Sequence, residues 1–239
     1  MKPVLGNITI NHVNHLRELI KNYTTDTILK EYIQNADDAG ATELIVTYDK
    51  QTYPELFGSQ FEDVAYPSLL LTNNAKFNDS DFESILELHA ENKIEDSYST
   101  GRFGLGFRSS YSITDYPSIF SSNRIIWLDD LQKTICKGTS STYGMWYEES
   151  FSNIDEWLNT FKTAGYDESV PFEKTIFRLP IRRKEKDFNH PLSTEVFSFD
   201  KFLIWCDEWR DNARDLLFLR NLNKLVLQEI QEDGKTIIH

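Results

Sequence analysis

The sequence predicts an α/β sandwich, because helical and strand patterns alternate along its 239 residues. In some segments apolar residues recur at the spacing of a helix. Other segments are short aliphatic or aromatic runs bounded by turn residues, as in strands. The hydrophobic share of 40% and the aromatic share of 13% supply enough apolar material for one sizeable core. We therefore expect residues 1–239 to form a single domain.

The first half of the chain alternates between expected helices and strands. Thr24, Thr25 or Asp26 can cap the start of a long apolar stripe, and Gly40 can end it. Two aliphatic runs follow, and the second breaks at paired asparagines. The expected elements are helices at 11–21 and 24–39, strands at 41–49 and 66–74, a loop at 51–64, and a helix at about 79–89.

The second half opens with residues 91–106, which are polar and then glycine-rich, the composition of a mobile segment over a site. Near the end, Asp233 and Gly234 signal a hairpin turn. The expected elements are helices beginning at 107–113 and covering 153–165 and 200–220, a strand at 174–182, and a hairpin of 124–130 with 133–138. In the long last helix, four aromatic residues at helical spacing are expected in the core: Phe202, Trp205, Trp209 and Phe218.

Net charge and targeting signals exclude several classes of partner. The formal charge of −13 would repel nucleic acid and anionic membranes, so neither is expected as the main partner. The chain has no apolar run of 18 residues and no signal peptide, so we expect a cytoplasmic protein. Cys136 and Cys206 are too few and too far apart for a zinc pattern and are expected to be inert core thiols. The abrupt end within an apparent strand suggests the N-terminal part of a longer protein.

Two charged groups outside the main motifs are given no chemistry. The run "RRKEK" at 182–186 is expected to be a solvated loop. Asp129 and Asp130 are expected at the tip of the 124–138 hairpin.

The stretch "EYIQNADDAG" at 31–40 carries a polar row on an otherwise apolar helix. Glu31, Asn35 and Asp38 stand at i, i+4 and i+7, which puts them on one face, away from the apolar stripe. Spacing alone leaves two interpretations open. The row is either a solvated helix face or one wall of a nucleotide site.

The stretch "GRFGLGFRSSY" at 101–111 is the second motif. Its three glycines, Gly101, Gly104 and Gly106, allow the backbone to approach a ligand closely, and a helix beginning after them would aim free N–H groups at an anion. A phosphate site fits this pattern, and so does a tight loop with a packing role. The motif is neither a dinucleotide fingerprint nor a P-loop.

Together and in this order, the two stretches resemble the Bergerat-fold (GHKL) ATPases, which include gyrase B and heat-shock chaperones. More closely, the chain resembles the sacsin family, through "LKEYIQNADDAGATE", "NNAKF", "GRFGLGFRSSYSITDYPSIFSS" and "TIFRLPIR". The resemblance runs from about residue 15 to 230. It implies a two-layer α/β sandwich whose mixed, mainly antiparallel sheet is covered by helices on one face.

The resemblance also implies a role for each motif residue, with ATP and Mg²⁺ as cofactors. Glu31 would be the catalytic residue that orients the attacking water, and Asn35 the magnesium ligand. Asp38 would support this motif by pairing with Arg102 or a neighbouring backbone group, and Thr175 would bind adenine through a water. Backbone N–H groups around the phosphates would come from Gly101, Arg102, Phe103, Gly104, Leu105, Gly106 and Phe107.

The chain departs from the ATPase pattern at residues 73–77. The pattern there is Asp-x-Gly-x-Gly, whose aspartate binds the adenine amino group, whereas this chain has Asn73, Asn74 and, in place of the last glycine, Phe77. An asparagine accepts a hydrogen bond without the charge, and a phenylalanine narrows the pocket mouth. Two functions therefore stay open. One is a slow, chaperone-like ATPase whose lid signals to protein clients or further domains of the same polypeptide, and the other is a degenerate scaffold that serves as a non-hydrolysing interaction module.

Overall fold

A computed structural model describes most of the chain, and the fold below refers to those residues alone. They are residues 4–6, 12–22, 25–53, 64–65, 67–90, 105–134, 136–139, 141–182, 192–193 and 195–239.

Within these residues, nine strands form one sheet in the order β1-β6-β5-β4-β7-β3-β2-β8-β9. Only the β2–β8 pair is parallel, so the sheet is mixed and mainly antiparallel. The strands are β1 (Val4–Gly6), β2 (Glu43–Asp49), β3 (Ser68–Asn73), β4 (Ser118–Ser121), β5 (Arg124–Leu128), β6 (Tyr143–Tyr147), β7 (Thr175–Pro180), β8 (Lys224–Ile230) and β9 (Thr236–Ile238).

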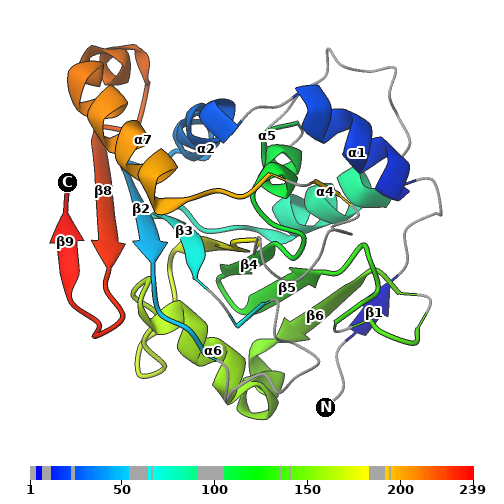
Figure 1. The fold of residues 1–239 in the computed structure, drawn as a ribbon. Coiled ribbons are helices and arrows are strands. Elements are labelled where there is room, and N and C mark those ends of the chain that lie inside the picture. The colour runs from blue at the N-terminus through cyan, green and yellow to red at the C-terminus, as the bar shows by residue number, and fades with distance from the viewer. Residues whose placement is uncertain are drawn as a thin grey trace.

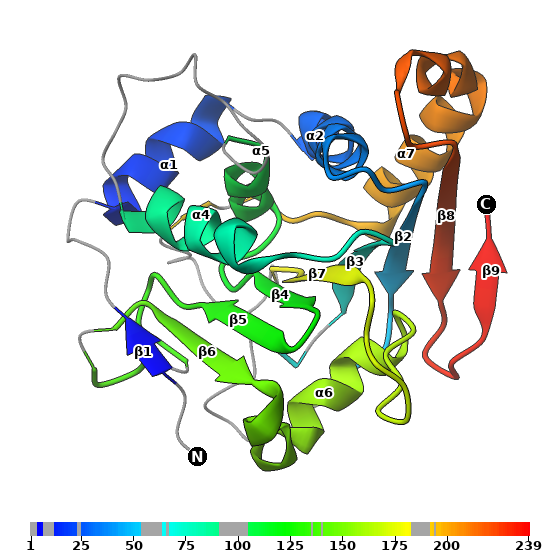
Figure 2. The same cartoon turned by 180° about the vertical axis from the view of Figure 1, so that it is seen from behind.

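Helices cover this sheet mainly on one face, which confirms the expected two-layer sandwich (Figure 1). That layer holds α1 (His12–Asn22), α2 (Thr25–Asp38), α4 (Asp79–Ala90), α5 (Leu105–Arg108) with the 3₁₀ turn η2 (Ser109–Ser112), and α7 (Phe199–Asp211) with the 3₁₀ turn η4 (Ala213–Phe218). The opposite face carries α6 (Asp155–Lys162) after the 3₁₀ turn η3 (Glu148–Asn153), as the view from behind shows (Figure 2).

Each face of the sheet has its own apolar core. The core under the main helix layer joins Leu29 of α2 and Phe202 of α7 to Phe177 of β7. The core under α6 joins Phe161 of that helix to Phe120 of β4. Alternate residues of one strand therefore serve opposite cores, the arrangement that a pleated strand imposes.

The helices expected at 11–21, 24–39, 79–89 and 153–165 are confirmed, as are the strands at 41–49, 66–74 and 174–182 and the hairpin around Asp233 and Gly234. Of the expected loop at 51–64, residues 54–63 lie outside the described residues. So do residues 91–104 of the segment expected to be mobile. The helix expected from 107 begins at Leu105 and becomes a 3₁₀ turn after Arg108.

The hairpin expected from 124–130 and 133–138 is wrong. β5 pairs instead with β4 and β6, and the described residues 133–134 and 136–138 form no strand. The reason is the Asp129 carboxylate, which accepts hydrogen bonds from the backbone N–H groups of Lys133, Thr134 and Cys136. These N–H groups are therefore not available to hydrogen-bond with a neighbouring strand.

The helix expected at 200–220 is shorter in the structure, where α7 ends at Asp211. Asn212 caps its end: the backbone N–H makes the last helical hydrogen bond to the carbonyl oxygen of Glu208, and the side-chain amide donates to the same oxygen. The chain continues as η4, which leaves Phe218 86% exposed rather than in the core. Phe202 and Trp205 are buried as expected, and Trp209 packs partly buried against them.

Gly40 gives a test of how α2 ends. Its φ is +78°, and a Cβ built there would meet nothing within 4 Å, so only backbone strain opposes a side chain. We expect Gly40→Ala to lower the free energy of unfolding by about 1 kcal/mol, measured by urea denaturation. Gly40→Asn is the control and should cost less, because asparagine tolerates this conformation. Equal stability of the alanine variant and the parent chain would contradict this explanation of the helix stop.

Candidate functional site

Helix α2 presents the first predicted motif. Its apolar side, which includes Ile28 and Ile33, is buried against the sheet. Glu31 and Asn35 are half-buried and Asp38 is exposed. Among the described residues, none forms a hydrogen bond or ion pair with the side chains of Glu31 and Asn35.

The Glu31 carboxyl has a raised pKa. Burial raises the pKa of this carboxyl above its usual range, and among the described residues no cation opposes the shift. A carboxylate with a raised pKa is a stronger base than an exposed one, which is what a residue that activates water requires.

Tyr32 connects α2 to the segment that follows the glycine-rich motif. Its hydroxyl lies 2.7 Å from the hydroxyl of Ser110 in η2, and Ser110 in turn donates to the carbonyl oxygen of Phe107 in α5. The Tyr32 ring also packs edge-on against Phe177 of β7, with centroids 5.0 Å apart. The face of α2 with Glu31 and Asn35 is thereby held close to α5.

The glycine-rich motif is described only in part. Gly101, Arg102, Phe103 and Gly104 lie outside the described residues. Leu105 and Gly106 form the first turn of α5, and the Phe107 ring is buried against Phe177, with centroids 6.0 Å apart. The Phe107 side chain therefore belongs to the core, and its carbonyl oxygen accepts a hydrogen bond from the Ser110 hydroxyl.

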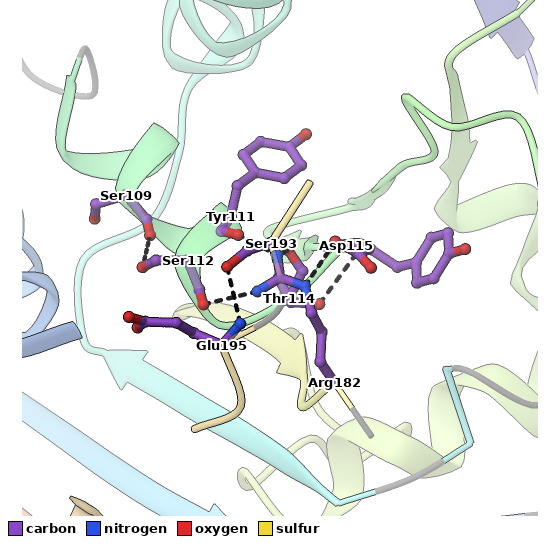
Figure 3. A network of polar contacts seen from close by, with 9 residues as sticks. Ser109, Tyr111, Ser112, Thr114, Asp115, Arg182, Ser193 and Glu195 are labelled. Atoms are coloured by element: carbon purple, nitrogen blue, oxygen red, sulfur yellow. Dashed lines mark hydrogen bonds and ion pairs between the residues drawn. The ribbon is translucent and has the colours of Figure 1, made fainter. Parts of the chain in front are cut away.

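The end of η2 is fixed by Arg182, whose prediction as part of a solvated loop is wrong. Its side chain is 1% exposed and pairs with Asp115 at 2.8 Å. Its remaining N–H groups donate to the carbonyl oxygens of Tyr111, Ser112 and Thr114 (Figure 3). A guanidinium can be buried here because its charge and its N–H donors are both satisfied. The rest of the run, residues 183–186, lies outside the described residues.

The residues predicted to contact adenine are already engaged within the protein. The Asn73 side-chain oxygen accepts from the backbone N–H of Ala75 at 3.0 Å. The Thr175 hydroxyl donates to the carbonyl oxygen of Ala75 at 2.8 Å and lies 2.7 Å from the Ser121 hydroxyl. Phe77 is 5% exposed, with its ring against Phe82 and Phe177. The structure brings Asn73 and Thr175 together as a register pair of β3 and β7.

Asn74 is placed apart from this pair. Its side chain accepts from the backbone N–H groups of Thr42 and Glu43 and donates to the Thr42 hydroxyl. It therefore ties the end of β3 to the start of β2, and its amide oxygen and one of its two amide N–H groups are used within the protein.

Asp37 is a structural residue that the sequence analysis missed. Its carboxylate accepts from the backbone N–H groups of Arg220, Asn221 and Leu222, at 3.1, 2.6 and 2.9 Å. Burial alone would raise the pKa of this carboxyl, but the three N–H donors outweigh it and lower the pKa. A signal was available, because Asp37 follows Ile33 by four residues and so falls on the buried stripe of the helix.

Asp129 and Asp130 are also buried rather than at an exposed tip. Asp129 organises the turn described above, and Asp130 accepts a hydrogen bond from the Tyr111 hydroxyl. Asp130 thus contacts η2, whereas Asp129 fixes the segment that follows it. They are not at a hairpin tip because the described residues 133–134 and 136–138 form no strand to pair with β5.

Cys136 and Cys206 are buried free thiols, as expected. Burial raises the pKa of Cys136 to about 12 and that of Cys206 to about 11, which suppresses the reactive thiolate. Among the described residues, no group of three His, Cys, Asp or Glu side chains could hold a metal ion. A magnesium ion at Asn35 would therefore need ligand oxygens from a bound phosphate.

None of the described helices is both long enough and apolar enough to span a membrane.

The fold is an α/β sandwich in which the side chains of Glu31 and Asn35 on α2 have no hydrogen-bond partner among the described residues, and in which α2 packs against α5. The Sacsin domain model matches residues 10–238, and the chain belongs to this family. Human Sacsin is 33% identical over 242 residues, which cover 96% of this chain but only 5% of that protein. Among solved structures, the N-terminal domain of a DNA repair protein matches 93% of this chain and 54% of its own, with 12% identity and a TM-score of 0.42.

Asp37 yields a prediction about pH. Because its folded pKa is lowered, its contribution to stability is complete above the ordinary aspartate pKa of about 3.9 and is lost as the pH falls through the lowered value. We expect Asp37→Asn to be less stable at pH 7 by about 1.5 to 3 kcal/mol, the usual range for hydrogen bonds to a charged group. The difference should shrink below pH 4, as measured by urea denaturation across pH.

Asp38→Asn is the matched control for this experiment, because the neighbouring carboxylate is exposed. It should leave stability nearly unchanged at every pH. A constant difference between the Asp37→Asn variant and the parent chain from pH 3 to 7 would contradict the assigned charge.

Proposed function

We propose that this domain binds ATP with Mg²⁺ and hydrolyses it slowly. The observation that carries the proposal is the pair Glu31 and Asn35, half-buried on one face of α2 with no partner among the described residues. A helix that only packs has no use for such a pair, because burying polar groups without partners costs free energy. The resemblance of both motifs to the Bergerat-fold ATPases supplies the identity of the ligand.

Each residue of the pair suits one part of the chemistry. The Asn35 amide oxygen is a hard ligand of the kind that Mg²⁺ takes, with phosphate oxygens and water completing the shell. Glu31, whose pKa is raised by burial, would orient and deprotonate the attacking water. Backbone N–H groups at the start of α5 would face the phosphates.

The structure also offers a route by which the nucleotide state could reach other domains or clients. Asp37 binds three consecutive backbone N–H groups just before β8, so a shift of α2 moves the segment that leads into this strand. This contact supports a chaperone-like role in which nucleotide binding is coupled to the rest of a larger protein.

A second function, a non-hydrolysing interaction module, is favoured by a different observation. Asn73, Thr175 and Phe77 are all engaged within the protein, so the adenine side offers few free polar groups. A parent chain that binds no nucleotide at millimolar concentration would favour this function over the ATPase.

Calorimetry of ATP binding with and without Mg²⁺ tests the metal part of the proposal. We expect Asn35→Ala to remove the magnesium-dependent gain in affinity, because it deletes the only protein ligand assigned to the ion. Gln34→Ala is the matched control, since Gln34 carries an exposed amide on the same helix. Equal ATP affinity of the parent chain in Mg²⁺ and in chelator would refute the proposed site.

Turnover of the Glu31→Gln variant tests the catalytic part. We expect ATP binding to persist while hydrolysis falls by about 10²-fold or more, because the variant cannot accept a proton from water. The raised carboxyl pKa means that ionised Glu31 costs stability at neutral pH, a cost that is relieved as the pH falls through that pKa. The free energy of unfolding of Glu31→Gln at pH 7 should therefore be no lower than that of the parent. Unchanged hydrolysis, or a marked loss of stability, would show that the carboxylate is structural.

A further inference from the structure

We propose that Asn73 contacts the nucleotide base as a hydrogen-bond donor, so that the site favours bases with an acceptor at that contact. The favoured ligands are then oxopurine nucleotides, in which hypoxanthine or guanine carries a carbonyl oxygen where adenine carries its amino group. The inference rests on the proposed function and names the base preference of the same site.

The oxygen of the Asn73 amide is occupied within the protein. It accepts a hydrogen bond from the backbone N–H of Ala75 at 3.0 Å. This contact fixes the orientation of the amide, because a backbone N–H only donates and the opposite orientation would bring two donors together. The oxygen and the nitrogen of an amide lie on opposite sides of its carbon, so the NH₂ group points away from Ala75.

The NH₂ group of Asn73 has no hydrogen-bond partner among the described residues. The residue is only 5% exposed, and polar groups with so little exposure are nearly always paired in native structures. Its nitrogen is not among the unpartnered polar atoms that are sealed from solvent. The NH₂ group is therefore a donor that a ligand can still reach.

Asn73 faces the helix layer that carries the proposed site. It follows Leu71 by two residues on β3, so both side chains lie on the same face of the sheet. Leu71 belongs to the core under that layer, together with Leu29 of α2. A base that lies against this end of β3, between the sheet and the helices, would meet the Asn73 NH₂ group.

The neighbouring backbone keeps the Asn73 oxygen from changing its partner. The Thr175 hydroxyl donates to the carbonyl oxygen of Ala75 at 2.8 Å, and the backbone N–H of Phe77 donates to the Ser121 hydroxyl at 2.9 Å. An adenine amino group that took the Asn73 oxygen would leave the Ala75 N–H unpaired, which costs free energy. A carbonyl oxygen on the base would add a hydrogen bond and break none.

The experiment compares calorimetric affinities for Mg²⁺-ATP and for the Mg²⁺ complex of inosine triphosphate (ITP) in the full chain. ITP is the probe because hypoxanthine has the carbonyl oxygen but lacks the further amino group of guanine. We expect ITP to bind about fivefold more tightly than ATP, the equivalent of one hydrogen bond. Equal affinities, or tighter binding of ATP, would overturn the inference.

Asn73→Asp should reverse the preference. One carboxylate oxygen would keep the hydrogen bond from Ala75, and the other would place an acceptor where the amide nitrogen stood. The affinity for ITP should fall and that for ATP should rise, so that ATP becomes the tighter ligand. An unchanged ratio of the two affinities contradicts the assigned donor. If the variant fails to fold, the comparison in the parent chain decides the question, since it needs no substitution.

Asn223→Asp is the matched control. Asn223 is exposed just before β8, so this variant makes the same change of charge away from Asn73. It should leave the ratio of the ITP and ATP affinities as it is in the parent chain. A reversal in this variant as well would show a general effect of charge and would overturn the inference.

The outcomes separate the inference from the proposed function. A parent chain that binds ATP as tightly as ITP, or more tightly, overturns the base preference and leaves the proposed function standing. A parent chain that binds neither nucleotide at millimolar concentration overturns both.

Discussion

The contact between the Tyr32 and Phe177 rings fixes α2 on the sheet, and the site is arranged around it. The ring centroids are 5.0 Å apart. Glu31 directly precedes Tyr32, and Asn35 follows it by about one helical turn. Thr175 lies two residues before Phe177 on β7, so it shares the face of the strand that meets α2. The aromatic pair thus packs the helix that carries the first motif against the strand that carries Thr175.

Buried charges then define the position of the segments around this contact. Asp37 holds the chain that enters β8, Asp129 holds the turn after β5, and Arg182 holds the end of η2. Each of these side chains hydrogen-bonds backbone N–H or C=O groups in segments that lie between the regular elements. These bonds favour one conformation of each segment. The apolar cores favour a compact sandwich, while these three side chains specify where its loops lie.

The sequence predicted α2 and β7 because their signals are local. An apolar stripe with Gly40 at its end, or a short run such as "TIFRLP" that alternates apolar and other residues, indicates its own structure. Asp37 and Arg182 could not be placed in the same way, since their partners lie 183 and 67 residues away. A charged residue is exposed in most proteins, and only the folded chain shows which one has been given partners.

Errors in the predicted elements have a similar origin. Residues 133–138 have the composition of a strand, but the Asp129 carboxylate takes the N–H groups that a strand would use. The end of α7 did carry a local signal in Asn212, whose side chain competes for the helix carbonyl of Glu208. The aromatic spacing that continued to Phe218 outweighed it in the sequence analysis.

The two sides of the proposed site differ in how well their polar groups are satisfied. On α2, Glu31 and Asn35 are half-buried with no partner among the described residues, so a ligand that binds there adds contacts without breaking any. On β3 and β7, a base that used the Asn73 oxygen or the Thr175 hydroxyl would compete with the hydrogen bonds to Ala75. An exchange of one hydrogen bond for another yields little net free energy. Most of the affinity for a nucleotide would therefore come from its phosphates and metal ion, and discrimination among bases would be correspondingly weak.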